Sequence, residues 1–129
     1  MPDLFSDAGI AAWRTRLDNS DAFRRAARGW SGTVLLVERS GAATERSTYI
    51  AVDDGTLQAS RTATTSDIAN AEFVLQASVD TWRDLVTGKA DLLPAALTGA
   101  LRLERGSVLR LIPHAGAAAA MLREAGTSG

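Results

Sequence analysis

The 129-residue sequence contains no cysteine and only one histidine. The absence of cysteine excludes disulfide bonds, thiolate nucleophiles and cysteine-ligated metal sites. A catalytic role for the one histidine, His114, would need a nucleophile and an orienting acid beside it, and no spacing in the chain indicates either. We therefore expect His114 to face solvent, and we predict neither a metal site, a cofactor nor an enzymatic activity.

Long apolar runs and an excess of one charge sign are also missing. No apolar stretch reaches the roughly 18 residues of a membrane span, so we expect no stable membrane insertion. Fourteen basic and fifteen acidic side chains give a net charge of −1. This balance lacks the basic footprint of a nucleic-acid-binding protein, and it argues against strong attraction to anionic membranes. Because residues 1–13 do not resemble a secretory signal and Thr127-Ser128-Gly129 is no peroxisomal tripeptide, we expect a cytoplasmic protein.

The apolar residues, 46% of the chain, fit a soluble protein whose residues 1–129 form a single domain. Alanine alone accounts for 24 positions. Since alanine buries little surface, leucine, valine, isoleucine and the aromatic residues must supply most of the core. A wall rich in alanine is compatible with a cavity, although tight helix packing is the commoner explanation.

Periodicity and turn signals predict alternating regular elements along the whole chain. We expect helix over residues 6–28, interrupted at Asn19-Ser20-Asp21, then strands over 33–38, 48–52, 57–62 and 72–77, helices over 78–86 and 91–97, a strand over 100–104, a helical turn from 107 that ends before Pro113, and a final helix over 114–125. Ser40 to Ala43 is expected to form a turn. Asp53-Asp54-Gly55 is typical of a hairpin turn rather than a calcium loop. The order predicts an α+β fold of two layers, with a mostly antiparallel, five-stranded sheet and helices over one face.

The segment from Thr81 to Gly106 carries an ordered pattern of glycines and leucines. It consists of Trp82, Leu85, Gly88, Pro94, Gly99, Leu101, Leu103 and Gly106. This pattern resembles the signature stretch of the sterol carrier protein type 2 family, and Gly29-Trp30-Ser31-Gly32, before the first strand, resembles bacterial stand-alone members. The resemblance implies an apolar tunnel between the layers and non-enzymatic binding or transfer of a fatty acid, acyl thioester, sterol-like molecule or other lipid.

Without the resemblance, a set of apolar positions would be interpreted as ordinary packed core. With it, the same positions become candidate ligand contacts. These are Phe73, Leu75, Trp82, Leu85, Leu93, Leu97, Leu101, Leu103, Leu109, Ile112, Met121 and Leu122. Arg102, Arg105 and Arg110 are candidates to receive a charged head group, although a solvated face is the more common role for such a cluster. We expect Trp13, Trp30 and Trp82 to be core anchors rather than membrane-interface anchors.

Three alternatives stay open from the sequence. The chain is an accessory module that presents a lipid or quinone intermediate to a partner enzyme, or a structural domain that forms homodimers and fills the gap with its own side chains. A small hydrolase is the third alternative, and it rests only on the presence of serine, aspartate and His114.

Overall fold

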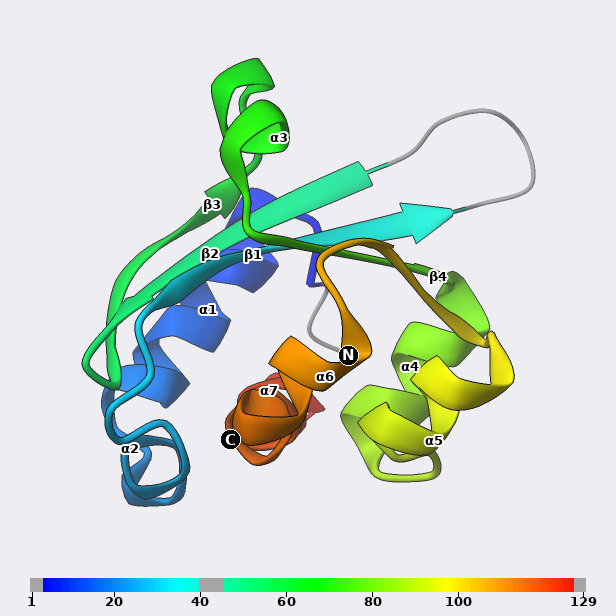
Figure 1. Cartoon of the computed structure of the whole chain (residues 1–129). Coiled ribbons are helices and arrows are strands. Elements are labelled where there is room, and N and C mark those ends of the chain that lie inside the picture. Colours follow the sequence, from blue (N-terminus) through cyan, green and yellow to red (C-terminus); the bar gives the residue numbers. More distant parts are fainter. Residues whose placement is uncertain (1–3, 40–45, 127–129) are drawn as a thin grey trace.

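The structure is a computed structural model, and it describes residues 4–39 and 46–126 (Figure 1). Its elements are α1 (Asp7–Asp18), α2 (Asp21–Ala26), β1 (Gly32–Arg39), β2 (Arg46–Asp53), β3 (Thr56–Thr62), α3 (Thr65–Asn70), β4 (Phe73–Ser78), α4 (Val79–Thr87), α5 (Leu92–Thr98), β5 (Leu101–Arg105), α6 (Val108–Leu111), the 3₁₀ turn η1 (Ile112–His114) and α7 (Ala115–Gly126). The α+β class and the five strands are confirmed.

The five strands form one mixed sheet in the order β3-β2-β1-β4-β5. Three pairings are antiparallel, and only β1 with β4 is parallel. The parallel pair arises because the chain leaves the β3 edge, passes through α3 and returns on the other side of β1. Strand alternation then places Val34 and Leu36 on one face of the sheet and Leu35 and Val37 on the other.

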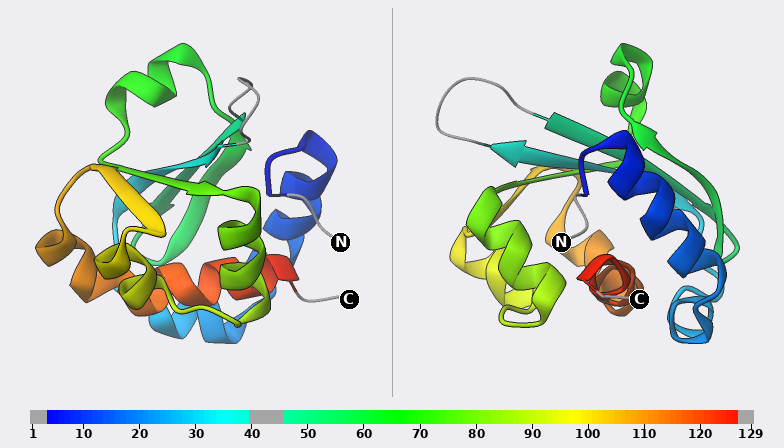
Figure 2. Two further views of the ribbon diagram at one scale, coloured as in Figure 1. Left: turned by 90° about the vertical axis from the view of Figure 1, so that its right-hand side faces the viewer. Right: turned by 180° about the vertical axis from the view of Figure 1, so that it is seen from behind.

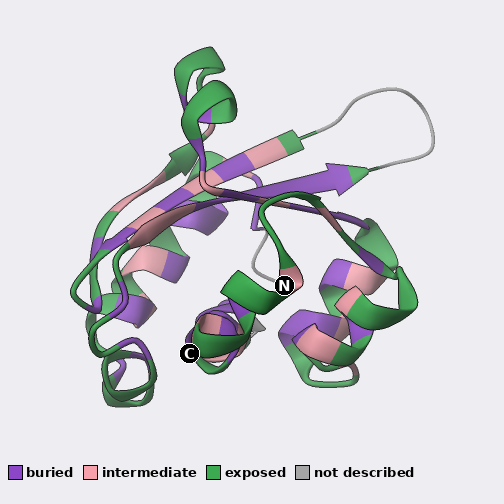
Figure 3. Cartoon of the chain, in the orientation of Figure 1, coloured by how far each residue is buried: buried purple, intermediate pink, exposed green. Residues whose placement is uncertain are grey.

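One layer of helices covers the first of these faces. Figures 1 and 2 show α1, α2, α4, α5, α6 and α7 together on this side, with α7 running between α1 and α4. Every strand contributes apolar side chains to the main core between the layers, and the buried positions in Figure 3 concentrate there. Burial of this shared apolar surface is the main force that holds the helices on the sheet.

Serine side chains cap the start of four of the helices. Ser6, Ser20, Ser78 and Ser107 each accept a hydrogen bond from the backbone N–H of the third residue that follows. These bonds satisfy N–H groups that have no partner within the helix. The predicted break of the first helix at Asn19-Ser20-Asp21 is thereby confirmed.

The hairpin between β2 and β3 is also confirmed. Asp54 and Gly55 both have positive φ, at 49° and 77°. Two consecutive positive φ values are typical of the type I′ turn, whose twist matches that of paired strands. The turn expected at Ser40 to Ala43 lies outside the described residues.

The helical turn that begins after Ser107 was expected to end before Pro113. Instead, α6 continues through η1 directly into α7. Pro113 lies in the first turn of η1, where its missing N–H leaves no helical hydrogen bond unmade. The chain therefore bends at this point without leaving the helix layer.

Helix α3 lies on the other side of the sheet, where the sequence predicted no element over residues 63–71.

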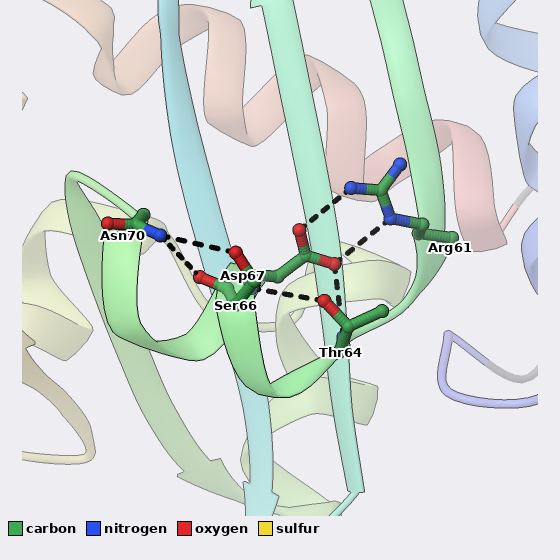
Figure 4. Close-up of polar contacts among 5 residues, drawn as sticks. All are labelled: Arg61, Thr64, Ser66, Asp67 and Asn70. Atoms are coloured by element: carbon green, nitrogen blue, oxygen red, sulfur yellow. Dashed lines mark hydrogen bonds and ion pairs between the residues drawn. The ribbon is translucent and has the colours of Figure 1, made fainter.

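Thr64 and Asp67 form a reciprocal capping box at the start of α3. Asp67 also accepts hydrogen bonds from the Arg61 guanidinium at 2.7 and 3.0 Å (Figure 4). These bonds from Arg61, followed by those from Thr64, lower the pKa of Asp67 from its usual 3.8 to about 2 and outweigh the effect of burial.

This depressed pKa makes a pH-dependent contribution to stability. The carboxylate stabilises the fold fully above its unfolded pKa of 3.8, and the contribution disappears as the pH falls toward about 2. We expect Asp67→Asn to lower the free energy of unfolding by about 1 kcal/mol at neutral pH, as for loss of a helix cap. Urea unfolding at several pH values checks this prediction, because the difference between wild type and variant should shrink on acidification. A difference that stays constant with pH would contradict the assigned role of the charge.

Candidate functional site

The candidate ligand contacts separate into buried and exposed groups. Seven of them are at most 3% exposed in the core between sheet and helices: Phe73, Leu75, Trp82, Leu85, Leu101, Met121 and Leu122. Leu93 and Leu103 are partly buried and pack against this core. Leu97, Leu109 and Ile112 are exposed by 74%, 80% and 48%. The structure thus brings most of the predicted residues together, while these three lie at the surface.

The sheet side of the buried group comes from the two neighbouring strands β4 and β5. Phe73 and Leu75 face the helices because they are two residues apart on β4. Antiparallel pairing places Leu103 opposite Leu75 and Leu101 opposite Ala77. These side chains belong to the main apolar core or pack against it, and α4 contacts β4 while α5 contacts β5.

Two tryptophans fix the helix side of the core. The Trp82 indole N–H donates to the Val37 carbonyl at 2.9 Å, and the Trp13 indole N–H donates to the Met121 carbonyl at 2.7 Å. A buried indole needs such an acceptor, because an unpaired N–H in an apolar core is costly. The first bond joins α4 to β1 and the second joins α1 to α7. The expected role of Trp13, Trp30 and Trp82 as core residues agrees with exposures of 2% or less.

Leu97, Leu109 and Ile112, called here the rim, come from α5, α6 and η1. Figure 1 shows α5 beside α4, and α6 beside the start of α7, all within the helix layer. Large aliphatic side chains with about half or more of their surface in water are individually common, and those of the rim are candidates for contact with an apolar ligand. Leu93, which lies four residues before Leu97 on α5, is partly buried and packs against the core.

The sequence analysis missed Leu4 and Phe5, which are each only 5% exposed and belong to the main core. The signal for them is a hydrophobic residue directly before a helix cap and another five residues later, here Phe5 and Ile10 around Ser6. This spacing marks apolar side chains that fix the angle at which the chain enters a helix. Residues before the first cap therefore take part in the core.

The three candidate head-group arginines are exposed, as expected, and each has a partner in the protein. Arg102 pairs with Glu104 at 3.5 Å, and Arg110 pairs with Glu72 at 2.8 Å. Arg105 donates to the backbone carbonyls of Ala69 and Ala71. A ligand carboxylate or phosphate would have to compete with these partners.

His114 was expected to face solvent, and this expectation was wrong. Its ring is partly buried and stacks on the Trp30 indole, with centroids 5.4 Å apart and planes 16° from parallel. The continuation of α6 through η1 carries His114 over Trp30, which the assumed break before Pro113 did not anticipate. The histidine therefore packs the start of α7 against the entrance to β1.

A polar depression of about 470 Å³ lies away from the predicted contacts. It is lined by Asp21, Arg24, Arg25, Arg28, Asp54, Gly55 and Thr56. Its walls are charged side chains of α2 and the hairpin turn between β2 and β3, so it lacks the apolar lining that a lipid tail requires. In the part of the chain that the structure describes, no helix has both the length and the apolar character to cross a membrane.

Comparison with known proteins connects this architecture to a family. The chain is similar to a crystal structure of sterol carrier protein 2, with a TM-score of 0.85 and 27% identity, covering 98% of this chain and 100% of the other. A solution structure from Thermus thermophilus, described as possibly a sterol carrier protein, gives 0.82 and 28%, covering 100% and 93%. Palmitated SCP2L2 from Aedes aegypti shares the fold at 0.58 and 13%, covering 88% and 90%.

A comparison with curated proteins gave no match. The SCP-2 sterol transfer family, however, matches residues 12–105, which include the ordered glycines and leucines from Trp82 to Leu103. The matched region contains all five strands and the helices α4 and α5, and thus most of the buried contact group. The chain therefore belongs to the SCP-2 sterol transfer family.

Proposed function

We propose that this protein binds and transfers one acyl-chain lipid, such as a fatty acid or an acyl thioester, without chemically changing it. The observation that carries the proposal is the apolar core between the sheet and the helices, which Phe73, Leu75 and Leu101 line from the sheet side, together with the exposed aliphatic side chains of the rim. The tail lies between the sheet and the helices, against Phe73, Leu75 and Leu101. The family membership supports a hydrophobic ligand in this layer.

A flexible chain fits this interior better than a rigid ring system. Side chains from sheet and helices already meet in the core, so a ligand must separate them as it enters. An acyl chain is narrow and can follow the boundary between the layers, whereas a sterol would force them further apart. The palmitate carried by the Aedes aegypti neighbour is consistent with this ligand class.

Burial of the tail provides enough free energy for useful affinity. Each enclosed methylene contributes roughly 0.8 kcal/mol, so a chain of about 16 carbons gains on the order of 12 kcal/mol before costs. Immobilisation and the separation of packed side chains reduce this to an affinity near micromolar. The head group stays in water at the rim, since Arg102 and Arg110 already have acidic partners.

The rim provides the test of where the lipid enters. We expect the triple variant Leu97→Gln, Leu109→Gln and Ile112→Gln to take up a fluorescent fatty acid from vesicles about tenfold more slowly, because apolar contact at the mouth is lost. Thermal stability should change little, since all three side chains are exposed. Stopped-flow fluorescence measures the uptake rate.

The matched control is Ile68→Gln. Ile68 is 45% exposed on α3, which lies over the opposite face of the sheet. This variant should take up lipid at the wild-type rate. Equal rates for the rim variant and the wild type would show that lipid enters elsewhere.

A further inference from the structure

The N-terminal segment lies at the end of the helix layer opposite α6. The left view of Figure 2 shows the first described residues at one end of this layer and α6 at the other. We propose that Phe5 is the end wall of the lipid site and sets the length of the acyl chain that the protein accepts. This inference rests on the proposed function, because it assigns a length limit to the same site.

The contacts of Phe5 place it between the apolar interior and the partly buried ion pair of Arg46 and Glu38. Its ring meets the Trp82 ring edge-on, with centroids 6.0 Å apart and planes at 63°. On another side, the Arg46 guanidinium lies 5.5 Å from the ring centroid of Phe5. Arg46 in turn forms hydrogen bonds with the Glu38 carboxylate at 2.9 and 3.0 Å. An acyl chain that passes Trp82 would therefore meet first the Phe5 ring and then an ion pair.

A hydrogen bond from β2 holds this segment in place. The Thr48 hydroxyl is fully buried and donates to the Leu4 carbonyl at 2.7 Å. Leu4 and Phe5 are buried, with exposures of 5% each, although they precede the first helix. The end wall is thus a short segment tied to the sheet, and its side chains can be varied without altering the strands.

The length limit follows from the chemistry on the two sides of the ring. Methylene groups on the inner side gain about fourfold in affinity each when they leave water. Methylene groups beyond Phe5 would instead separate the Arg46 guanidinium from the Glu38 carboxylate. Breaking this ion pair is unfavourable. The favoured chain is consequently the one whose end reaches Phe5.

The test measures the binding of saturated fatty acids, from decanoate to eicosanoate, to the delipidated full-length chain by displacement of a fluorescent fatty acid. We expect Phe5→Ala to shift the best-bound chain to a longer one, with about fourfold tighter binding for each additional enclosed methylene. Phe5→Leu should give a smaller shift in the same direction. Phe5→Leu keeps most of the apolar volume of the side chain. If Phe5→Ala does not fold, Phe5→Leu therefore still tests the length limit.

Phe23→Ala is the matched control, because Phe23 is a 1% exposed phenylalanine of the same core on α2, away from α4. It should lose stability without a change in the preferred chain length. If the wild type and all three variants bind fatty acids with the same preferred chain length, the assignment of Phe5 is wrong and the proposed function stands. No binding of any fatty acid by wild type or variants would overturn both.

Discussion

Gly106→Ala is expected to destabilise the protein by about 3 kcal/mol or more, through two effects that act at the same position. Gly106 has φ of +90°, a conformation that costs a residue with a side chain roughly 1–2 kcal/mol. A Cβ atom there would also lie 2.5 Å from Cδ1 of Phe73. The Phe73 ring is 1% exposed and forms part of the predicted lipid contact surface, so it has no free space into which to move.

Gly99→Ala is the control for Gly106→Ala. Gly99 has a nearly equal φ of +87°, but a Cβ atom there meets nothing within 4 Å. This variant should lose only the roughly 1–2 kcal/mol of backbone strain. Thermal or urea unfolding of both variants therefore separates the strain from the contact with Phe73. Equal losses in the two variants would contradict the proposed packing of Phe73 beneath the turn after β5.

Leu103→Asp should weaken fatty-acid binding by about a hundredfold, because it places a carboxylate against the acyl chain. Leu103 lies opposite Leu75 on β5 and packs against the core, yet it is partly exposed. The charge can thus reach water in the free protein, so the variant is expected to fold. In the complex the carboxylate would be covered by the tail, and loss of its hydration costs several kcal/mol.

Ile68→Asp provides the comparison for Leu103→Asp. It introduces the same charge at a partly exposed aliphatic position, on α3 at the other face of the sheet. Fluorescent fatty-acid titration should show wild-type affinity for Ile68→Asp. If Leu103→Asp folds and binds fatty acid with unchanged affinity, β5 is not part of the binding surface.

Most of the fold could be predicted because its boundaries depend on local chemistry. Ser78 and Gly88 enclose α4, since a hydroxyl cap and a left-handed glycine are short-range features of a helix. Alternation on β4 and β5 likewise depends only on neighbouring residues. The parallel pairing of β1 with β4 and the position of α3 were not apparent, because both depend on which strands meet after a crossover.

The candidate site was predicted less completely, for a different physical reason. Helical spacing shows which residues share a face, but it does not show whether another element covers that face. Leu85 is buried in the core, whereas Leu97 and Leu109 are left exposed at the rim. Phe5 precedes the regular elements and has no periodic pattern of its own, so only its position before the Ser6 cap indicates that it is buried.

The most direct test of lipid binding is native mass spectrometry of the purified protein, followed by extraction and identification of what it releases. We expect one lipid with an acyl chain per protein molecule, and its loss after delipidation. A ligand-free mass, together with no thermal shift on addition of fatty acids, acyl thioesters or quinones, would contradict it. That result would favour a domain whose interior is filled by its own side chains.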